Sequence, residues 1–117
     1  MSTWLICGGR EFTDYELMYN TLKKLCDERG EPDHVITGGA RGADTLGWKW
    51  AQAKHIKFSI EFADWTQYGN RAGPIRNMAM LTKYKPDLVI AFPGGKGTAH
   101  MKWISKEAGV EVIEISK

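Results

Sequence analysis

Five short apolar runs alternate with longer amphipathic stretches along the whole chain. The runs read TWLIC, HVIT, KFSIEF, DLVIAF and VEVIEI and occupy residues 3–7, 34–37, 57–62, 87–92 and 110–115. They are rich in β-branched and aromatic residues, which favour strands. The stretches between them are long enough for helices. This alternation predicts a single α/β domain built around a parallel sheet.

The stretches between the runs predict four helices. The first begins with Thr13 and Glu16 in the spacing of a capping box and is stopped by Gly30 and Pro32. The others are expected over about residues 43–54, from Pro74 to about Tyr84, and over residues 98–108, with residues 64–80 forming a long loop that enters the third helix. The apolar residues expected to face inward are Met18, Leu22, Leu25, Ala43, Leu46, Trp50, Ala53, Met78, Leu81, Met101, Ile104 and Ala108.

The distribution of apolar and charged residues within the runs predicts their order in the sheet. The first and fourth runs are the most continuously apolar, as strands buried on both faces are, whereas the third and fifth carry charges that edge strands tolerate. This favours the order 3-2-1-4-5. The prediction is therefore one Rossmann-like, three-layer domain over residues 1–117, with a five-stranded, mostly parallel sheet.

Glycine-rich loops follow the first, second and fourth runs, in the sequences CGGREF, TGGARGAD and PGGKGT. In the expected order these runs are neighbours, so the loops meet in one crevice, where glycines let backbone N–H groups approach a phosphate. The alternative is that these glycines serve packing alone. The residues expected to contact a ligand are Gly8, Gly9, Arg10, Gly38, Gly39, Ala40, Arg41, Gly42, Asp44, Pro93, Gly94, Gly95, Lys96, Gly97 and Thr98.

The segment DWTQYGNRAGPIRNMAM, residues 64–80, adds polar and aromatic candidates. An arginine side chain can bind a phosphate or carboxylate group with two parallel hydrogen bonds, and aromatic rings stack on bases. The alternative is that the charges are solvated and the rings cover the edge of the sheet. The candidates for ligand contact in this segment are Trp65, Tyr68, Asn70, Arg71, Arg76 and Asn77.

Composition narrows the class of protein. The chain has 117 residues, 43% of them hydrophobic, and a net charge of +2, which is too small to indicate nucleic-acid binding by bulk charge. No signal peptide is recognisable, and we expect a cytoplasmic protein. Cys7 and Cys26 have no metal-ligand spacing with His34 or His55, so neither a metal nor a cofactor is expected.

Three segments resemble the SLOG superfamily of Rossmann-like nucleotide-binding domains, and most closely its YspA-like branch, which is related to LOG and DprA domains. They are TGGARGADTLGWKWA, AGPIRNMAM and FPGGKGTAHM. The resemblance implies a protein that binds a nucleotide or nucleotide-derived signalling molecule, such as an ADP-ribose derivative or a cyclic nucleotide, as a sensor or sequestering protein.

The resemblance to LOG enzymes breaks at one position. Arg76 and Met80 match their Arg-x-x-x-Met motif, but Met101 stands where these hydrolases carry a glutamate. A thioether can neither move a proton nor stabilise positive charge, so an enzyme is not expected. The alternative is a nucleotide N-glycosidase or phosphoribohydrolase that uses Asp44 or Glu11, although Asp44 also suits a first-turn acid favoured by the helix dipole. A third hypothesis, by analogy with DprA domains, is binding of single-stranded nucleic acid.

The tryptophan content indicates self-association. The chain has five tryptophans, and Trp48 and Trp103 lie off the inward stripes of their helices, where Met80 and His100 are expected to join them. Exposed aromatic surface on a small protein marks an interface, and two-fold pairing is the commonest way to bury it. We therefore expect a homodimer or a higher homo-oligomer. The alternative is that the tryptophans cover the sheet edges within one subunit.

Overall fold

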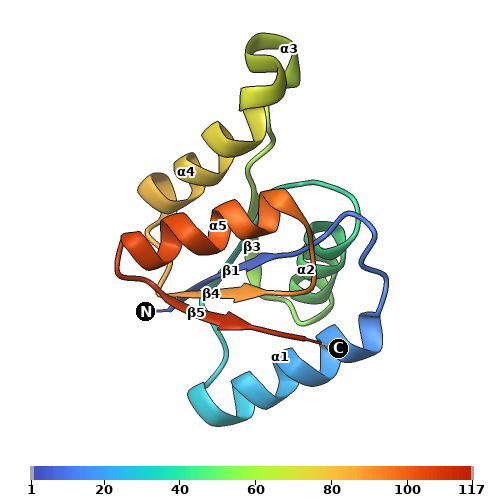
Figure 1. Cartoon of the computed structure of the whole chain (residues 1–117). Helices are drawn as coiled ribbons and strands as arrows, with labels where there is room; N and C mark the ends of the chain where they lie inside the picture. Colours follow the sequence, from blue (N-terminus) through green and yellow to red (C-terminus); the bar gives the residue numbers. More distant parts are fainter. Residues whose placement is uncertain (1, 117) are drawn as a thin grey trace.

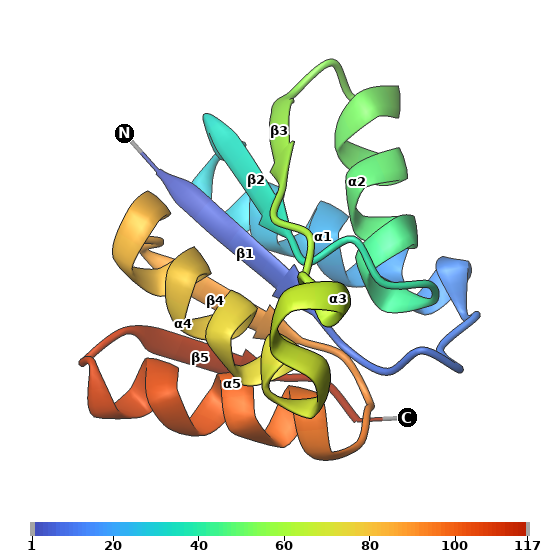
Figure 2. The same cartoon turned by 90° about the horizontal axis from the view of Figure 1, so that it is seen from above.

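The computed structural model describes residues 2–116 and contains one five-stranded sheet in the order β3-β2-β1-β4-β5 (Figures 1 and 2). All four strand pairs are parallel. The predicted order is confirmed. The strands are β1 (Thr3–Cys7), β2 (His34–Thr37), β3 (Lys57–Ile60), β4 (Leu88–Ala91) and β5 (Glu111–Glu114).

Helices cover both faces of the sheet, which makes three layers (Figure 2). One face packs on α1 (Tyr15–Arg29) and α2 (Ala43–Ala53), and the other on α4 (Ala72–Tyr84) and α5 (Lys96–Glu107). The central strands β1 and β4 are buried from both sides, while β3 and β5 are only partly buried, as their charged residues predicted. The carboxyl ends of all five strands therefore lie along one edge of the sheet.

Three helix starts differ from the prediction, and one of them is α5, which begins at Lys96 and not at residue 98. The N-cap of α1 is Asp14, whose carboxylate accepts a hydrogen bond from the Leu17 N–H at 3.0 Å, so Thr13 does not cap the helix. Both residues are good caps in isolation, and the backbone leading from the β1 loop decides between them. The third long helix begins at Ala72, two residues before Pro74, because the preceding turn leads into it without a break.

The inward faces of the helices also differ in part. In α2, Ala43 is buried as predicted, but near the end of the helix Ala51 is buried and Ala53 is exposed. In α4 the inward stripe passes through Asn77 and Met80, and Met78 is exposed. The α5 helix ends at Glu107, so Ala108 follows it and is exposed. The α4 shift arises because Asn77, a polar residue, occupies a buried position.

The loop expected between β3 and α4 is helical over much of its length. A four-residue helix, α3 (Trp65–Tyr68), is followed by a 3-10 turn, η1 (Gly69–Arg71), and all seven residues are exposed. The Asp64 carboxylate caps α3 by accepting from the Gln67 N–H at 3.0 Å. Figure 1 shows these residues projecting beyond the end of α4, and we call residues 65–71 the arm.

Across residues 2–116, every helix is too short or too polar to cross a bilayer. Both cysteines are free thiols. Cys7, at the end of β1, is buried, and burial raises its pKa to about 12. This thiol is therefore protonated and unreactive at neutral pH.

Candidate functional site

A cavity of about 470 Å³ opens beside the carboxyl ends of β1, β2 and β3, where Trp65 of α3 lies against Arg10 of the loop after β1. We call it the arginine cavity. Its volume lies within the range of about 300–1,000 Å³ that is usual for small-molecule sites. Its lining residues are Arg10, Gly38, Gly39, Ala40, Arg41, Phe62, Ala63, Trp65 and Arg76.

Three guanidinium groups give this cavity a positive character. The Arg10 guanidinium lies over the Trp65 ring, 5.4 Å from its centroid. Arg41 donates to the Glu11 carboxylate at 2.5 Å, and both side chains are largely exposed. Among the described residues that line the cavity, none carries a carboxylate. The arrangement suits an anionic ligand.

Arg76 is the most fixed of the three arginines. It comes from the second turn of α4, and its Nη1 donates to the Gly38 carbonyl oxygen. Its Nε donates to the Asn77 side-chain oxygen at 3.0 Å. Burial lowers the pKa of Arg76, while the nearby Asp44 carboxyl raises it. Arginine stays charged at neutral pH, and its remaining N–H groups are available for a ligand.

Asn77 links this arginine to the first turn of α5. Its side-chain nitrogen lies 3.2 Å from the Gly97 carbonyl oxygen, to which it donates, and 3.2 Å from Nδ1 of His100. The amide is buried, so these contacts satisfy groups that have left water. Arg76 and the glycine loop after β4 are thereby held side by side.

Asp44 lies behind the wall of the cavity. Its side chain is 6% exposed, and its Oδ2 accepts from the Ala40 N–H at 3.1 Å. Burial raises the pKa of Asp44 to about 6, against the opposing effects of the Ala40 N–H and the Arg76 charge. The sequence placed this carboxylate in contact with the ligand, but in the structure it contacts the loop that forms the wall.

The three glycine loops pack tightly against one another. The Gly9 N–H donates to the Pro93 carbonyl at 2.8 Å, and the Gly9 carbonyl accepts from the Ala43 N–H at 3.1 Å. A Cβ on Gly42, whose φ is +81°, would lie 2.3 Å from the Gly9 oxygen, and one on Gly94 would lie 2.6 Å from the Gly9 nitrogen. We call this contact the glycine junction. Close packing of the backbones, and at Gly42 the positive φ, require glycine at these positions.

The later glycines of the β4–α5 loop face open space. A Cβ on Gly95 or Gly97 would have no neighbour within 4 Å, Lys96 is exposed, and Thr98 is buried. The segment from Gly94 to Thr98 lies outside the described lining of the arginine cavity. Pro93 and Gly94 instead line a second hollow of about 560 Å³ on the β5 side. Arg76, which lines the arginine cavity, is linked to this segment through Asn77.

Phe62 and Ala63 line the cavity and were not among the predicted site residues. Phe62 is 70% exposed, and its ring lies where a Cβ on Gly39 would be. A large aromatic residue directly after an edge strand was the available signal. The predicted residues Asn70 and Arg71 lie in the exposed η1 turn, outside the described lining. Tyr68 also lies outside it.

The position of the missing glutamate is filled by a core residue. Met101 is 1% exposed and packs with Leu5 and Met80 between α5 and the sheet. The other carboxylate considered, Glu11, is exposed and paired with Arg41. Neither residue lines the arginine cavity in the described part of the chain.

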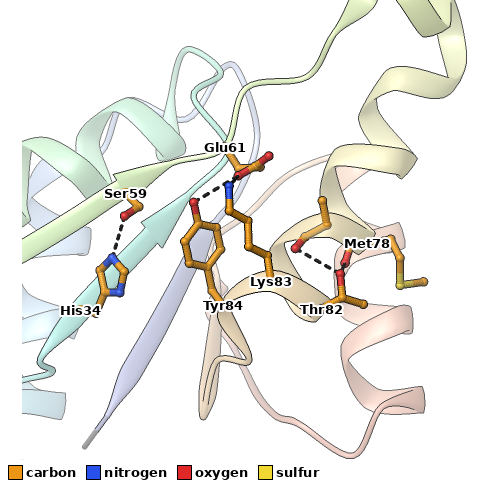
Figure 3. A network of polar contacts seen from close by, with 8 residues as sticks. His34, Ser59, Glu61, Met78, Thr82, Lys83 and Tyr84 are labelled. Atoms are coloured by element: carbon orange, nitrogen blue, oxygen red, sulfur yellow. Dashed lines mark hydrogen bonds and ion pairs between the residues drawn. The ribbon is translucent and has the colours of Figure 1, made fainter.

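A separate polar cluster lies on β2 and β3 beside the end of α4 (Figure 3). His34 Nε2 lies 2.7 Å from the Ser59 hydroxyl, and the Glu61 carboxylate accepts from Lys83 and Tyr84 at 3.2 Å each. These contacts tie α4 to the β3 edge. Within residues 2–116, no three His, Cys, Asp or Glu side chains gather in a way that would hold a metal ion.

Comparison with known proteins shows which protein family the chain belongs to. A family model described as the YspA, cpYpsA-related SLOG family matches residues 5–68. The "Gene 61 protein" of Mycobacterium phage D29 is 33% identical to this chain over 116 residues, which cover 93% of this chain and 92% of the phage protein. The phage protein's name states no activity. The family match supports a nucleotide-related ligand in broad terms.

Proposed function

Because the chain belongs to the YspA, cpYpsA-related SLOG family, we propose that it binds a nucleotide or nucleotide-derived signalling molecule and senses or sequesters it. The observation that carries this proposal is the arginine cavity, whose lining combines three arginines with two exposed aromatic rings. Guanidinium groups bind phosphate, and aromatic rings stack on bases. An ADP-ribose derivative or a cyclic nucleotide supplies both parts.

The proposed pose follows the charges. The base lies against Phe62 and Trp65, and the phosphate lies at Arg76, with the backbone from Gly94 to Thr98 as its second contact. The hydrogen bonds of Asn77 to Arg76 and to the Gly97 carbonyl support this pose, since they hold the two regions together. The free N–H groups of the first turn of α5 favour negative charge.

Binding is tested by calorimetry with ADP-ribose, cyclic AMP and AMP, and the ligand is identified by mass spectrometry of small molecules released from the denatured protein. Arg76→Met removes a charge-assisted contact, so affinity should fall about 10- to 100-fold. Tyr68→Ala, on the exposed arm but outside the cavity lining, is the matched control and should change affinity less than twofold. If no nucleotide binds and none is released, the proposal is wrong.

One observation keeps hydrolysis as the second candidate function. Asp44 is a carboxyl with a pKa of about 6, a value suited to a general acid or base, although it lies behind the cavity wall. Incubation with AMP and with NAD, followed by chromatography, separates the two functions. We expect no free base. Base release that Asp44→Asn abolishes would make the protein an N-glycosidase.

We also propose that the protein is a homo-oligomer. Trp103 on α5 is 62% exposed, and Met78 on the adjacent α4 is also exposed, so apolar surface spans these two helices. The predicted patch needs two corrections: Met80 is buried in the core, and Trp48 stacks on Phe58 at 5.7 Å within the same chain. Light scattering at micromolar concentration tests self-association. A mass of one chain at every concentration would contradict it.

A further inference from the structure

The peptide of Gly38 lies between two charged side chains. On one side, the Arg76 Nη1 donates to the Gly38 carbonyl oxygen. On the other, a Cβ on Gly38 would lie 3.0 Å from Oδ2 of Asp44, which accepts from the Ala40 N–H at 3.1 Å. One wall of the arginine cavity is therefore held by a carboxyl group that lies outside the described lining of the cavity.

The groups that face Asp44 come from three surrounding elements. Arg76 on α4 and Arg10 in the loop after β1 both lower its pKa. The thiol of Cys7 at the end of β1 is close enough for Asp44 to raise its pKa, and it stays neutral. Asp44 thus lies near two arginines that also line the cavity, and their charges favour its ionised form.

We propose that Asp44 is a positioning residue of the arginine cavity: it fixes the wall formed by Gly38 to Ala40 through the Ala40 N–H, and its ionisation controls how strongly Arg76 attracts an anionic ligand. This inference rests on the proposed function. An ionised Asp44 offsets the charge of Arg76, whereas a protonated Asp44 leaves that charge to the ligand. Anion binding and proton binding at Asp44 are then cooperative, and the coupling is reciprocal.

This coupling acts close to neutral pH, because burial raises the pKa of Asp44 to about 6. A bound anion beside Arg76 raises this pKa further, since like charges oppose ionisation. If the further rise is about one unit, affinity changes about tenfold across the titration. A phosphomonoester itself titrates near pH 6, so a phosphodiester is the appropriate probe.

The experiment measures the affinity of ADP-ribose by calorimetry between pH 8 and pH 5.5 in the wild type, Asp44→Asn and Asp44→Ala. Wild-type affinity should rise about tenfold as the pH falls, for the one-unit coupling above. Asp44→Asn keeps an oxygen for the Ala40 N–H but has no charge. Its profile should be flat, and at pH 8 it should bind at least as tightly as the wild type. Parallel profiles in these two proteins would overturn the control of affinity by ionisation.

Asp44→Ala isolates the positioning role. It also lacks the charge but leaves the Ala40 N–H without its acceptor, so at pH 8 its affinity should be about fivefold below that of Asp44→Asn, as for loss of one hydrogen bond. Equal affinities would overturn the positioning role.

A measurement without ligand separates this inference from the proposed function. In the wild type, the NMR shift of the Ala40 amide should titrate with a midpoint near pH 6, and in Asp44→Asn it should not. If no probe binds the wild type, the proposed function fails, and this titration still decides whether Asp44 controls the wall. The same titration in both proteins would overturn the inference.

Discussion

The loops GGARGAD after β2 and PGGKGT after β4 are alike in sequence but differ in their surroundings. The first forms a wall of the arginine cavity, backed by Asp44 and Arg76. The second lies outside that cavity, with one glycine locked in the junction and two facing open space. The two loops differ in the segments that lie beside them. Phe62 and the arm, which follow β3, lie beside the first loop, whereas the end of β5 leaves the second loop exposed.

This comparison shows that a glycine-rich loop has two separable functions. Gly42 and Gly94 allow the backbones to meet, so they maintain the fold. Gly95 and Gly97 have no such constraint, which leaves their backbone accessible for a ligand. Substitutions within each loop should therefore separate folding from binding.

The largest effect is expected from a pair of glycine-to-alanine substitutions. Gly42→Ala places a methyl group against the Gly9 oxygen at a φ of +81°, and should lower the free energy of unfolding by about 3 kcal/mol or more. Gly97→Ala adds a methyl group to a helix in open space, and should raise it by about 0.5–1 kcal/mol. Urea denaturation measures both. Similar losses of unfolding free energy in the two variants would contradict the separation of folding glycines from binding glycines.

The next effect contrasts carboxyl groups beside the two loops. The pKa of Asp44 in the folded protein lies above its value in the unfolded chain, so the native form binds more protons. As the pH falls from 7 to 4, this group therefore raises the free energy of unfolding by about 2–3 kcal/mol. Glu114, beside the second hollow, has its pKa lowered to about 2 by Lys106 and Lys102, and its contribution is lost as the pH falls toward 2.

Denaturation profiles of the wild type, Asp44→Asn and Glu114→Gln should separate these contributions. Relative to the wild type, Asp44→Asn should lose the gain between pH 7 and pH 4, whereas Glu114→Gln should change the slope of the profile only below about pH 4.5, where unfolded glutamate titrates. An unchanged slope between pH 7 and pH 4 in Asp44→Asn would refute the raised pKa.

A smaller effect tests whether the ligand reaches the second loop. Gly97→Asp places a negative charge in the first turn of α5, where it favours the helix by about 0.3–1 kcal/mol but repels a phosphate. Affinity for ADP-ribose should fall about tenfold, a like-charge cost of about 1.4 kcal/mol. Gly97→Asn, with a side chain of the same shape and no charge, is the control. Unchanged affinity in Gly97→Asp would confine the ligand to the arginine cavity.

The smallest effect concerns the aromatic wall of the first loop. Phe62→Ala removes a stacking surface worth about 1 kcal/mol for a base, so affinity for cyclic AMP should fall about fivefold. Inorganic pyrophosphate, which has no base, should bind both proteins alike. Equal loss for the two ligands would mean that Phe62 supports the wall and does not contact a base.

The strand order could be predicted because the residue composition of each strand indicates how deeply the strand is buried. The uninterrupted apolar run of β4 and the charged run of β5 gave their places, and the expected order is confirmed. The helical structure of the arm could not be predicted, because a four-residue helix is too short to show a periodic pattern. The inward face of α4 was misplaced since Asn77 is buried by its hydrogen bonds rather than by apolarity. Such partners are visible only in three dimensions.

The candidate site was predictable in outline for a similar reason. The strand order brings the loops after β1, β2 and β4 to one edge, and Arg10, Arg41 and Arg76 line one cavity, but the loop after β4 lies outside its described lining. Which glycines touch one another and which face solvent depends on distances of a few tenths of an ångström at the junction. The sequence records the glycine but not its neighbour.

The arm has a consequence for how this protein can diversify. It follows β3 and projects beyond the end of α4 (Figure 1). Its Trp65 ring lies against Arg10 of the loop after β1. Insertions and deletions are tolerated best in exposed segments that leave the core intact. Relatives that keep the glycine junction but vary the length of residues 61–71 should retain the sheet and exchange one ligand for another. The arm is therefore the segment to graft when a new specificity is wanted.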